Sequence, residues 1–217
     1  MIENNYKLVQ NSIAKCAVKS GRNPEEIQLV AVTKTVTWQE AEILYRCGQR
    51  DFGENRLQEA FHKQEESPKD CRWHLIGSLQ SKKARKAVGK FALIHSVDSL
   101  ELAQKLSVCS LEENISTQIL LQINTSGEAA KHGMTVDQCR RSFEVFTQFP
   151  NLSIQGLMTM APFVEDEIVV RKCFAELRNL RDELKLHHLS MGMTNDYMWA
   201  IDEGATIVRI GTALFEA

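Results

Sequence analysis

A lysine at the end of an apolar segment is the residue whose chemistry is most readily inferred from this sequence. Lys34 follows the run 28–33, Gln-Leu-Val-Ala-Val-Thr, whose length and β-branched content favour a buried strand. Apolar surroundings at the end of that strand would disfavour the charged ammonium and make the amine nucleophilic, as a Schiff-base lysine requires. The ordinary alternative is a lysine that extends from a strand end into solvent.

Two later segments each combine a glycine with a hydroxyl side chain. Gly192-Met193-Thr194 and Gly211-Thr212 follow the last two predicted strands, and Thr194 precedes a helix predicted to begin near Asn195. Loops of this kind bind phosphate through backbone N–H groups and a helix N-terminus, although they can also be ordinary turns. Together with a strand-end lysine they indicate an aldehyde that carries a phosphate, and pyridoxal 5′-phosphate fits that description.

An arginine on the last predicted strand adds a positive charge near these loops. Arg209 lies two residues before Gly211, so its guanidinium would face either the phosphate or the pyridine nitrogen of such a cofactor. Beside the nitrogen, an arginine would keep the ring unprotonated and weaken the electron withdrawal that carbanion chemistry needs. The structural alternative is an ion pair with Asp202 or Glu203.

Strand-like and helix-like segments alternate along the whole chain, which predicts a parallel sheet with helical crossovers. Eight such units are the number that closes a (β/α)₈ barrel, and we expect a single barrel domain over residues 1–217 with an extra N-terminal helix; an open doubly wound sheet is the competing fold. Since functional loops of a barrel follow the carboxyl ends of its strands, Lys34, Gly192 and Gly211 would meet at one face. The predicted strands are 28–33, 51–54, 73–78, 91–96, 118–124, 153–159, 188–191 and 206–210, and the predicted helices are 2–20, 38–47, 57–66, 82–88, 99–108, 135–149, 167–186 and 195–203.

Composition excludes several functional classes. The chain has 217 residues, a formal net charge of −2 and 43% hydrophobic residues, so no bulk basic field indicates a nucleic-acid or membrane partner. No apolar run reaches the roughly eighteen residues of a membrane span, and the polar N-terminus favours a cytoplasmic protein.

The six cysteines form no C-x-x-C pair, so we expect neither disulfides nor a metal site. His74 is expected to be a hydrogen-bonded core histidine, and we expect a monomer because no strongly apolar surface helix stands out.

Six segments resemble the motifs of one known family, the pyridoxal phosphate homeostasis proteins (YggS/PROSC). The resemblance runs from about residue 28 to the end, with the motifs in the family's order and spacing. The sequence departs from the family at Leu75, at Lys82, at Thr194, where the usual serine is replaced but the hydroxyl is kept, and in the short tail 213–217. The matching segments are Ala-Val-Thr-Lys-Thr (31–35), Phe-Gly-Glu-Asn (52–55), Trp-His-Leu-Ile-Gly-Ser-Leu-Gln (73–80), Gly-Leu-Met (156–158), Ser-Met-Gly-Met (190–193) and Val-Arg-Ile-Gly-Thr (208–212).

The resemblance implies a barrel similar to the N-terminal domain of alanine racemase that holds pyridoxal 5′-phosphate as a Schiff base (an internal aldimine) with Lys34. It implies a cofactor contact from Asn55 and a role in intracellular vitamin B6 homeostasis without established turnover, with enzymes that lack the cofactor as possible recipients. The positions that match the family's phosphate end are Thr194, Arg209, Gly211 and Thr212, with Met193 beside them.

Two enzymatic readings stay open beside this one. A pyridoxal-phosphate racemase or lyase would need a second acid–base group across the ring and a closing domain, neither of which we expect here. The three tyrosines (Tyr6, Tyr45 and Tyr197) do not end predicted strands, which disfavours that reading. A Schiff-base aldolase acting on a sugar phosphate would use Lys34 and the same phosphate loops, and only the family resemblance disfavours it.

Overall fold

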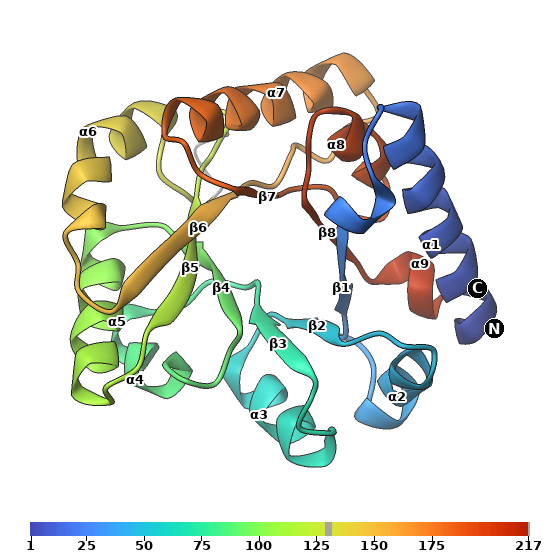
Figure 1. Ribbon diagram of the computed structural model, residues 1–217, viewed down its shortest axis with the longest axis horizontal. Helices are drawn as coiled ribbons and strands as arrows, with labels where there is room; N and C mark the ends of the chain where they lie inside the picture. Colours follow the sequence, from blue (N-terminus) through green and yellow to red (C-terminus); the bar gives the residue numbers. More distant parts are fainter. Residues whose placement is uncertain (129–131, 217) are drawn as a thin grey trace.

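The computed structural model describes residues 1–128 and 132–216, and its centre is a closed barrel of parallel strands. Each strand pairs with the next along the chain, and β8 pairs with β1 to close the ring, so the predicted (β/α)₈ barrel is confirmed (Figure 1). The strands are β1 (Gln28–Val32), β2 (Asp51–Glu54), β3 (Arg72–Leu75), β4 (Leu93–Val97), β5 (Thr117–Gln122), β6 (Leu152–Met158), β7 (His188–Ser190) and β8 (Ile207–Ile210).

Helices surround the barrel and connect successive strands (Figure 1). None of the helices within the described residues has both the length and the apolar character to cross a bilayer. The α-helices are α1 (Ile2–Lys19), α2 (Trp38–Arg46), α3 (Leu57–Glu66), α4 (Ala84–Ala87), α5 (Leu100–Glu112), α6 (Val136–Thr147), α7 (Glu167–Glu183), α8 (Tyr197–Asp202) and α9 (Thr212–Phe215), and two short 3₁₀ helices are η1 (Pro24–Glu26) and η2 (Ser81–Lys83).

Local sequence explains where several of these helices begin and end. Thr37 accepts a hydrogen bond from the N–H of Glu40 while the Glu40 carboxylate accepts one from the N–H of Thr37, so the predicted capping box starts α2. Gly48 follows α2 with φ of +100°, a backbone conformation that other residues adopt only with strain. These signals fix the length of the connection between β1 and β2.

Several helices differ from prediction, and the helix predicted over 99–108 continues to Glu112. The helix predicted over 82–88 is a 3₁₀ turn over Ser81–Lys83 followed by only four α-helical residues, and Gly89, with φ of +72°, lies just beyond it. The helix predicted from Asn195 begins at Tyr197, two residues later. The helix α9, formed by the C-terminal segment, was not predicted.

The core has two layers of different character. A large apolar cluster fills the space between the strands and the helices, and a small one inside the barrel consists of Val30, Leu93, Leu120, Met158 and Ile207. Since so few apolar residues occupy the barrel, the remaining interior is polar. Buried side chains there include Asp51, His74, His95, Ser190 and Arg209.

The two ends of the described chain lie close together (Figure 1). The Asn5 side-chain amide of α1 donates a hydrogen bond of 3.0 Å to the carbonyl of Glu216, just after α9. Leu214 of α9 is fully buried in the outer core. The short C-terminal tail therefore packs against α1, although it departs from the family pattern.

Candidate functional site

A cavity of about 600 Å³ opens where the carboxyl ends of the strands meet the following loops. This volume lies within the range of about 300–1,000 Å³ that small-molecule sites occupy. The structure brings all seven predicted site residues together along its lining: Lys34, Asn55, Met193, Thr194, Arg209, Gly211 and Thr212.

Lys34 stands at the mouth of the cavity, in an exposed turn two residues after β1. Its backbone neighbour Thr33 is held firmly: the Thr33 N–H donates to the carbonyl of Gly53 at 3.0 Å and its hydroxyl donates to Glu54 Oε1 at 2.6 Å. The Lys63 ammonium donates to the Thr33 carbonyl at 2.5 Å. The structure thus fixes where Lys34 starts, but the expectation that apolar walls surround its amine is wrong, because the residue is exposed.

Asn55 follows β2 directly and lines the cavity beside the end of β3. A Cβ atom at Gly77 would overlap the backbone carbonyl of Asn55, so glycine at position 77 permits the two chain segments to touch. The segment after β3 therefore lies directly against Asn55, the residue after β2.

Arg209 is a buried cation on the inner side of the barrel, 4% exposed, and it lines the cavity. Its NH1 group donates to Ser190 Oγ at 2.6 Å and its NH2 group donates to the carbonyl of Thr159 at 3.0 Å. These bonds engage two of the five N–H donors of a guanidinium. Burial lowers the pKa of Arg209 to about 10, so the side chain stays charged at neutral pH.

The ion pair considered for Arg209 is not formed. Asp202 and Glu203 both bind Arg171 of α7, and Glu203 also binds Arg178, on the outside of the barrel. Among the described residues, no carboxylate lies within ion-pair distance of Arg209. A buried, incompletely hydrogen-bonded cation therefore faces a cavity, which favours an anionic ligand there.

The loops after β7 and β8 add backbone donors to the same lining. Within the described part of the chain, no hydrogen bond is found for the N–H groups of Thr194, Asn195 or Gly211. The Thr194 hydroxyl accepts a bond of 3.4 Å from the N–H of Ala213, which joins the two loops. Free N–H groups beside a buried guanidinium are suited to bind phosphate oxygens.

Gly192 allows the first of these loops to pass under α8. Its φ is +92°, and a Cβ atom there would lie 2.6 Å from the Cβ of Ala200 and 2.9 Å from the Cα of Tyr197. Both the conformation and the packing therefore require glycine. This requirement explains the glycine that the sequence places before Met193 and Thr194.

Asp196 occupies the position where the sequence suggested a helix N-terminus. Its carboxylate accepts a hydrogen bond of 2.6 Å from the N–H of Met193, and α8 begins only after it. Burial raises the pKa of Asp196, while the bond from Met193 and the positive charge of Arg209 oppose that effect. The helix expected from Asn195 therefore starts after Asp196, and the N–H groups of Thr194 and Asn195 belong to the loop before it.

Several residues of the site were not predicted. Gln122 and Asp196 line the cavity, and Ser190 and His95 lie behind Arg209. Gln122 could have been found, since it ends β5 as Lys34 follows β1. The partnership of Ser190 with His95 joins strands 95 residues apart in sequence, and no local pattern signals it. His74 is a hydrogen-bonded core histidine, as expected.

None of the six cysteines forms a disulfide within the described residues. No group of three or more histidine, cysteine, aspartate or glutamate side chains among the described residues could hold a metal ion.

Comparison with known proteins places the chain in one family. The family model for the N-terminal domain of alanine racemase matches residues 2–217. The pyridoxal phosphate homeostasis protein of Aquifex aeolicus is 41% identical over 215 residues, covering 95% of this chain and 94% of that protein. Its counterpart in Pseudomonas aeruginosa is 41% identical over 219 residues, covering 100% of this chain and 95% of that protein.

A solved structure supports the same assignment. PipY of Synechococcus elongatus, solved with pyridoxal phosphate bound, superimposes with a TM-score of 0.87 at 36% identity, covering 99% of this chain and 100% of that one. The predicted resemblance is therefore confirmed over the whole length of the chain. The chain belongs to the pyridoxal phosphate homeostasis proteins, within the alanine racemase N-terminal domain family.

Proposed function

We propose that this protein binds pyridoxal 5′-phosphate in the cavity and serves in the cell's homeostasis of that cofactor. The observation that carries the proposal is the convergence on one cavity of Lys34, Arg209 and three backbone N–H groups that have no hydrogen bond within the described residues. The names of its relatives and the cofactor bound to PipY support the same ligand.

The residues present fit this cofactor. Pyridoxal phosphate supplies an aldehyde that condenses with a primary amine, a phosphate and a pyridine ring. Lys34 supplies the amine at the cavity mouth, and the N–H groups of Thr194, Asn195 and Gly211 supply donors for an anion. Arg209 contributes a fixed positive charge, and Asn55, Met193 and Thr212 complete the wall.

The arrangement favours binding and release over turnover. None of the three tyrosines lines the cavity in the described structure, since their hydroxyls contact Gln49, Asp70 and Ser12 instead. A racemase would need such an acid–base group opposite the lysine. Because Lys34 is also exposed, its amine stays accessible to solvent amines, and enzymes that lack the cofactor are the proposed recipients.

The test is an absorption spectrum of the purified protein after addition of pyridoxal phosphate. We expect a visible band at about 420 nm in the native protein, as is general for this cofactor bound through an amine. We expect this band to be lost in Lys34→Ala. Lys69→Ala is the matched control, because Lys69 is an exposed lysine in the loop before β3, at the opposite end of the barrel. This variant should keep the band.

A protein that stays colourless with added cofactor would refute the proposal. The aldolase reading would then be preferred, since it requires Lys34 and the phosphate donors but no pyridoxal phosphate. A band that persists in Lys34→Ala would instead assign the covalent attachment to another amine.

A further inference from the structure

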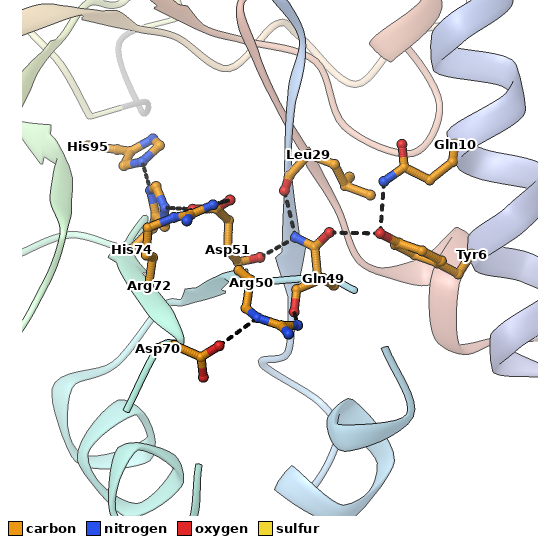
Figure 2. A network of polar contacts seen from close by, with 10 residues as sticks. All are labelled: Tyr6, Gln10, Leu29, Gln49, Arg50, Asp51, Asp70, Arg72, His74 and His95. Atoms are coloured by element: carbon orange, nitrogen blue, oxygen red, sulfur yellow. Dashed lines mark hydrogen bonds and ion pairs between the residues drawn. The ribbon is translucent and has the colours of Figure 1, made fainter. Parts of the chain in front are cut away.

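A chain of buried hydrogen bonds crosses the barrel interior behind Arg209. Asp51 Oδ1 lies 3.0 Å from His74 Nε2, and His74 Nδ1 lies 2.9 Å from His95 Nε2 (Figure 2). His95 Nδ1 lies 2.8 Å from Ser190 Oγ, which accepts the bond from Arg209 NH1. The chain thus links β2, β3, β4, β7 and β8, and it ends at the cavity.

The end of this chain far from the cavity is anchored in two ways. Arg72 donates two hydrogen bonds to the Asp51 carboxylate, at 2.7 and 2.5 Å (Figure 2). The Gln49 amide donates to the backbone carbonyl of Asp51 at 2.6 Å. The side chain of Asp51 is 8% exposed, whereas that of Arg72 is 56% exposed. The chain therefore starts from an anion held in place at the opposite face of the barrel.

The chemistry of its two ends gives the chain a direction. An ionised Asp51 can only accept, so His74 Nε2 donates to it. At the other end, Ser190 Oγ accepts from the Arg209 guanidinium, and its own hydrogen is directed to its other partner, His95 Nδ1. His95 is fully buried, and burial keeps its pKa well below the usual range, so this ring is neutral. Since its Nδ1 accepts from the Ser190 hydroxyl, its Nε2 carries the proton and donates to His74 Nδ1.

This direction determines what Ser190 offers to Arg209. The Ser190 hydroxyl hydrogen is used by His95, so the lone pairs of Ser190 Oγ are free to accept from the guanidinium. Each donor in the chain also polarises the next, which strengthens the bond to a charged group. If the chain ran the other way, His95 and Arg209 would both donate to the same oxygen.

We infer that Asp51, His74 and His95 are positioning residues which, through Ser190, fix the guanidinium of Arg209 at the cofactor cavity. The inference rests on the proposed function. It extends the cofactor site through the barrel interior to Asp51, which lies near the opposite face of the barrel. None of the three lines the cavity, so each would act on the cofactor only through Arg209.

A double-mutant cycle tests this dependence. In the native background we expect Asp51→Asn and His95→Gln each to weaken cofactor affinity about tenfold, the loss typical of a charge-assisted hydrogen bond, and to move the absorption maximum of the bound cofactor. In an Arg209→Lys background the same changes should alter affinity less than about twofold, because residues that act through one group are not additive. Equal losses in both backgrounds would refute the inference.

His188→Gln is the matched control. His188 is a half-buried histidine of β7 whose ring bonds to Thr206 and, among the described residues, has no hydrogen bond to this chain, although its charge acts on His95. The His188→Gln variant should keep the native cofactor affinity and absorption spectrum. A loss of affinity equal to that of His95→Gln would indicate a general packing effect instead. If the native protein binds no cofactor, the proposed function itself is refuted. If the native protein binds the cofactor and Asp51→Asn binds it equally well, only the present inference is refuted.

A measurement on the native protein decides the matter even if a variant fails to fold. Imidazole ¹⁵N chemical shifts report which ring nitrogen carries the proton, and we expect Nε2–H for both His74 and His95. An Nδ1–H tautomer at His95 would reverse the chain and refute the inference. The absence of any change in these shifts in Arg209→Lys would also contradict a coupled chain.

Discussion

At the scale of single residues, the barrel interior contains two opposite charges, Asp51 and Arg209, that do not form an ion pair with each other. Asp51 is paired with Arg72 near the amino ends of the strands. Arg209 is buried near the carboxyl ends, where its hydrogen-bond partners among the described residues are a hydroxyl and a carbonyl. Burying a charge without a counter-charge costs free energy that polar contacts offset in part. The cavity side of the barrel therefore has an electrostatic preference for an anion, while the opposite side has none.

The carboxylate of Asp51 makes the stability of the protein dependent on pH. Burial by itself would raise the pKa of Asp51, but hydrogen bonds from Arg72 and His74 outweigh it and lower the pKa from 3.8 to about 2. The folded state thus favours the ionised form, which contributes about 2 kcal/mol above pH of about 4 and loses that contribution as the pH falls through about 2.

Urea unfolding of the native protein and Asp51→Asn checks this sign. At neutral pH we expect the free energy of unfolding of the variant to be lower by about 2 kcal/mol, and at pH of about 2 we expect the gap to close. A gap that keeps its size across this range would show that the carboxylate contributes through packing and not through its charge.

At the scale of elements, a buried ion pair joins the starts of the loops on which Lys34 and Asn55 lie. Lys63 of α3 donates to Glu54 Oε1 of β2 at 2.5 Å and to the Thr33 carbonyl at the end of β1. Glu54 is fully buried, and no hydrogen-bond partner within the described residues is found for its Oε2 atom. The pair therefore holds β1, β2 and α3 together while leaving one oxygen unsatisfied.

Lys63→Met should destabilise the protein by about 3–5 kcal/mol, because the Glu54 carboxylate would stay buried without its cation. The double variant Glu54→Gln/Lys63→Met should recover much of that loss in urea unfolding. Lys7→Met, which breaks the exposed pair with Glu3 on α1, is the control and should change little. Similar losses in the single and double variants would contradict this account.

Alanine substitutions at two glycines would distinguish the cost of backbone strain from the cost of steric crowding. Gly192 and Gly48 have similar φ values of +92° and +100°, but a methyl group at Gly192 would meet atoms of α8, whereas one at Gly48 would have no neighbour within 4 Å. Gly48→Ala should therefore cost about 1 kcal/mol of unfolding free energy, whereas Gly192→Ala should cost about 1–3 kcal/mol more and weaken cofactor binding. Urea unfolding and a cofactor titration of both variants measure these effects. If Gly192→Ala and Gly48→Ala change stability and binding equally, α8 must shift to accommodate the added methyl group.

The strand-to-loop pattern was predictable from sequence because each strand and helix carries its own local signal. Capping residues such as Thr37 and turn glycines such as Gly48 mark ends within a few positions, and strand ends identify the cavity lining. The exposure of Lys34 is the alternative that the sequence left open, and only the structure decides it. The contact of Ser190 with His95 was not predictable, since it depends on how distant strands come together. The helix predicted over 82–88 is shorter in the structure, where α4 ends two residues before the left-handed Gly89.

At the scale of the whole molecule, α1 connects the barrel to the helices that follow its last two strands. Val9, Ile13 and Ala17 bury one side of α1 in the outer core. Gln10 donates to the Tyr6 hydroxyl, which in turn donates to the buried side chain of Gln49 (Figure 2). None of these residues lines the cavity, so the N-terminal helix supports the fold without contacting the site.

Cofactor binding and folding should therefore be separable by mutation. Pyridoxal phosphate at about 100 times its Kd should raise the free energy of unfolding of the native protein by about 2.7 kcal/mol, because the cavity uses loops after β1, β2, β7 and β8 and exists only in the closed barrel. Ile13→Ala should lower the starting stability by about 2–5 kcal/mol but keep that increment. Lys34→Ala, an exposed position, should keep the starting stability and lose most of the increment. Urea unfolding with and without cofactor measures both quantities, and an increment that falls with Ile13→Ala would mean that α1 also shapes the site through α8.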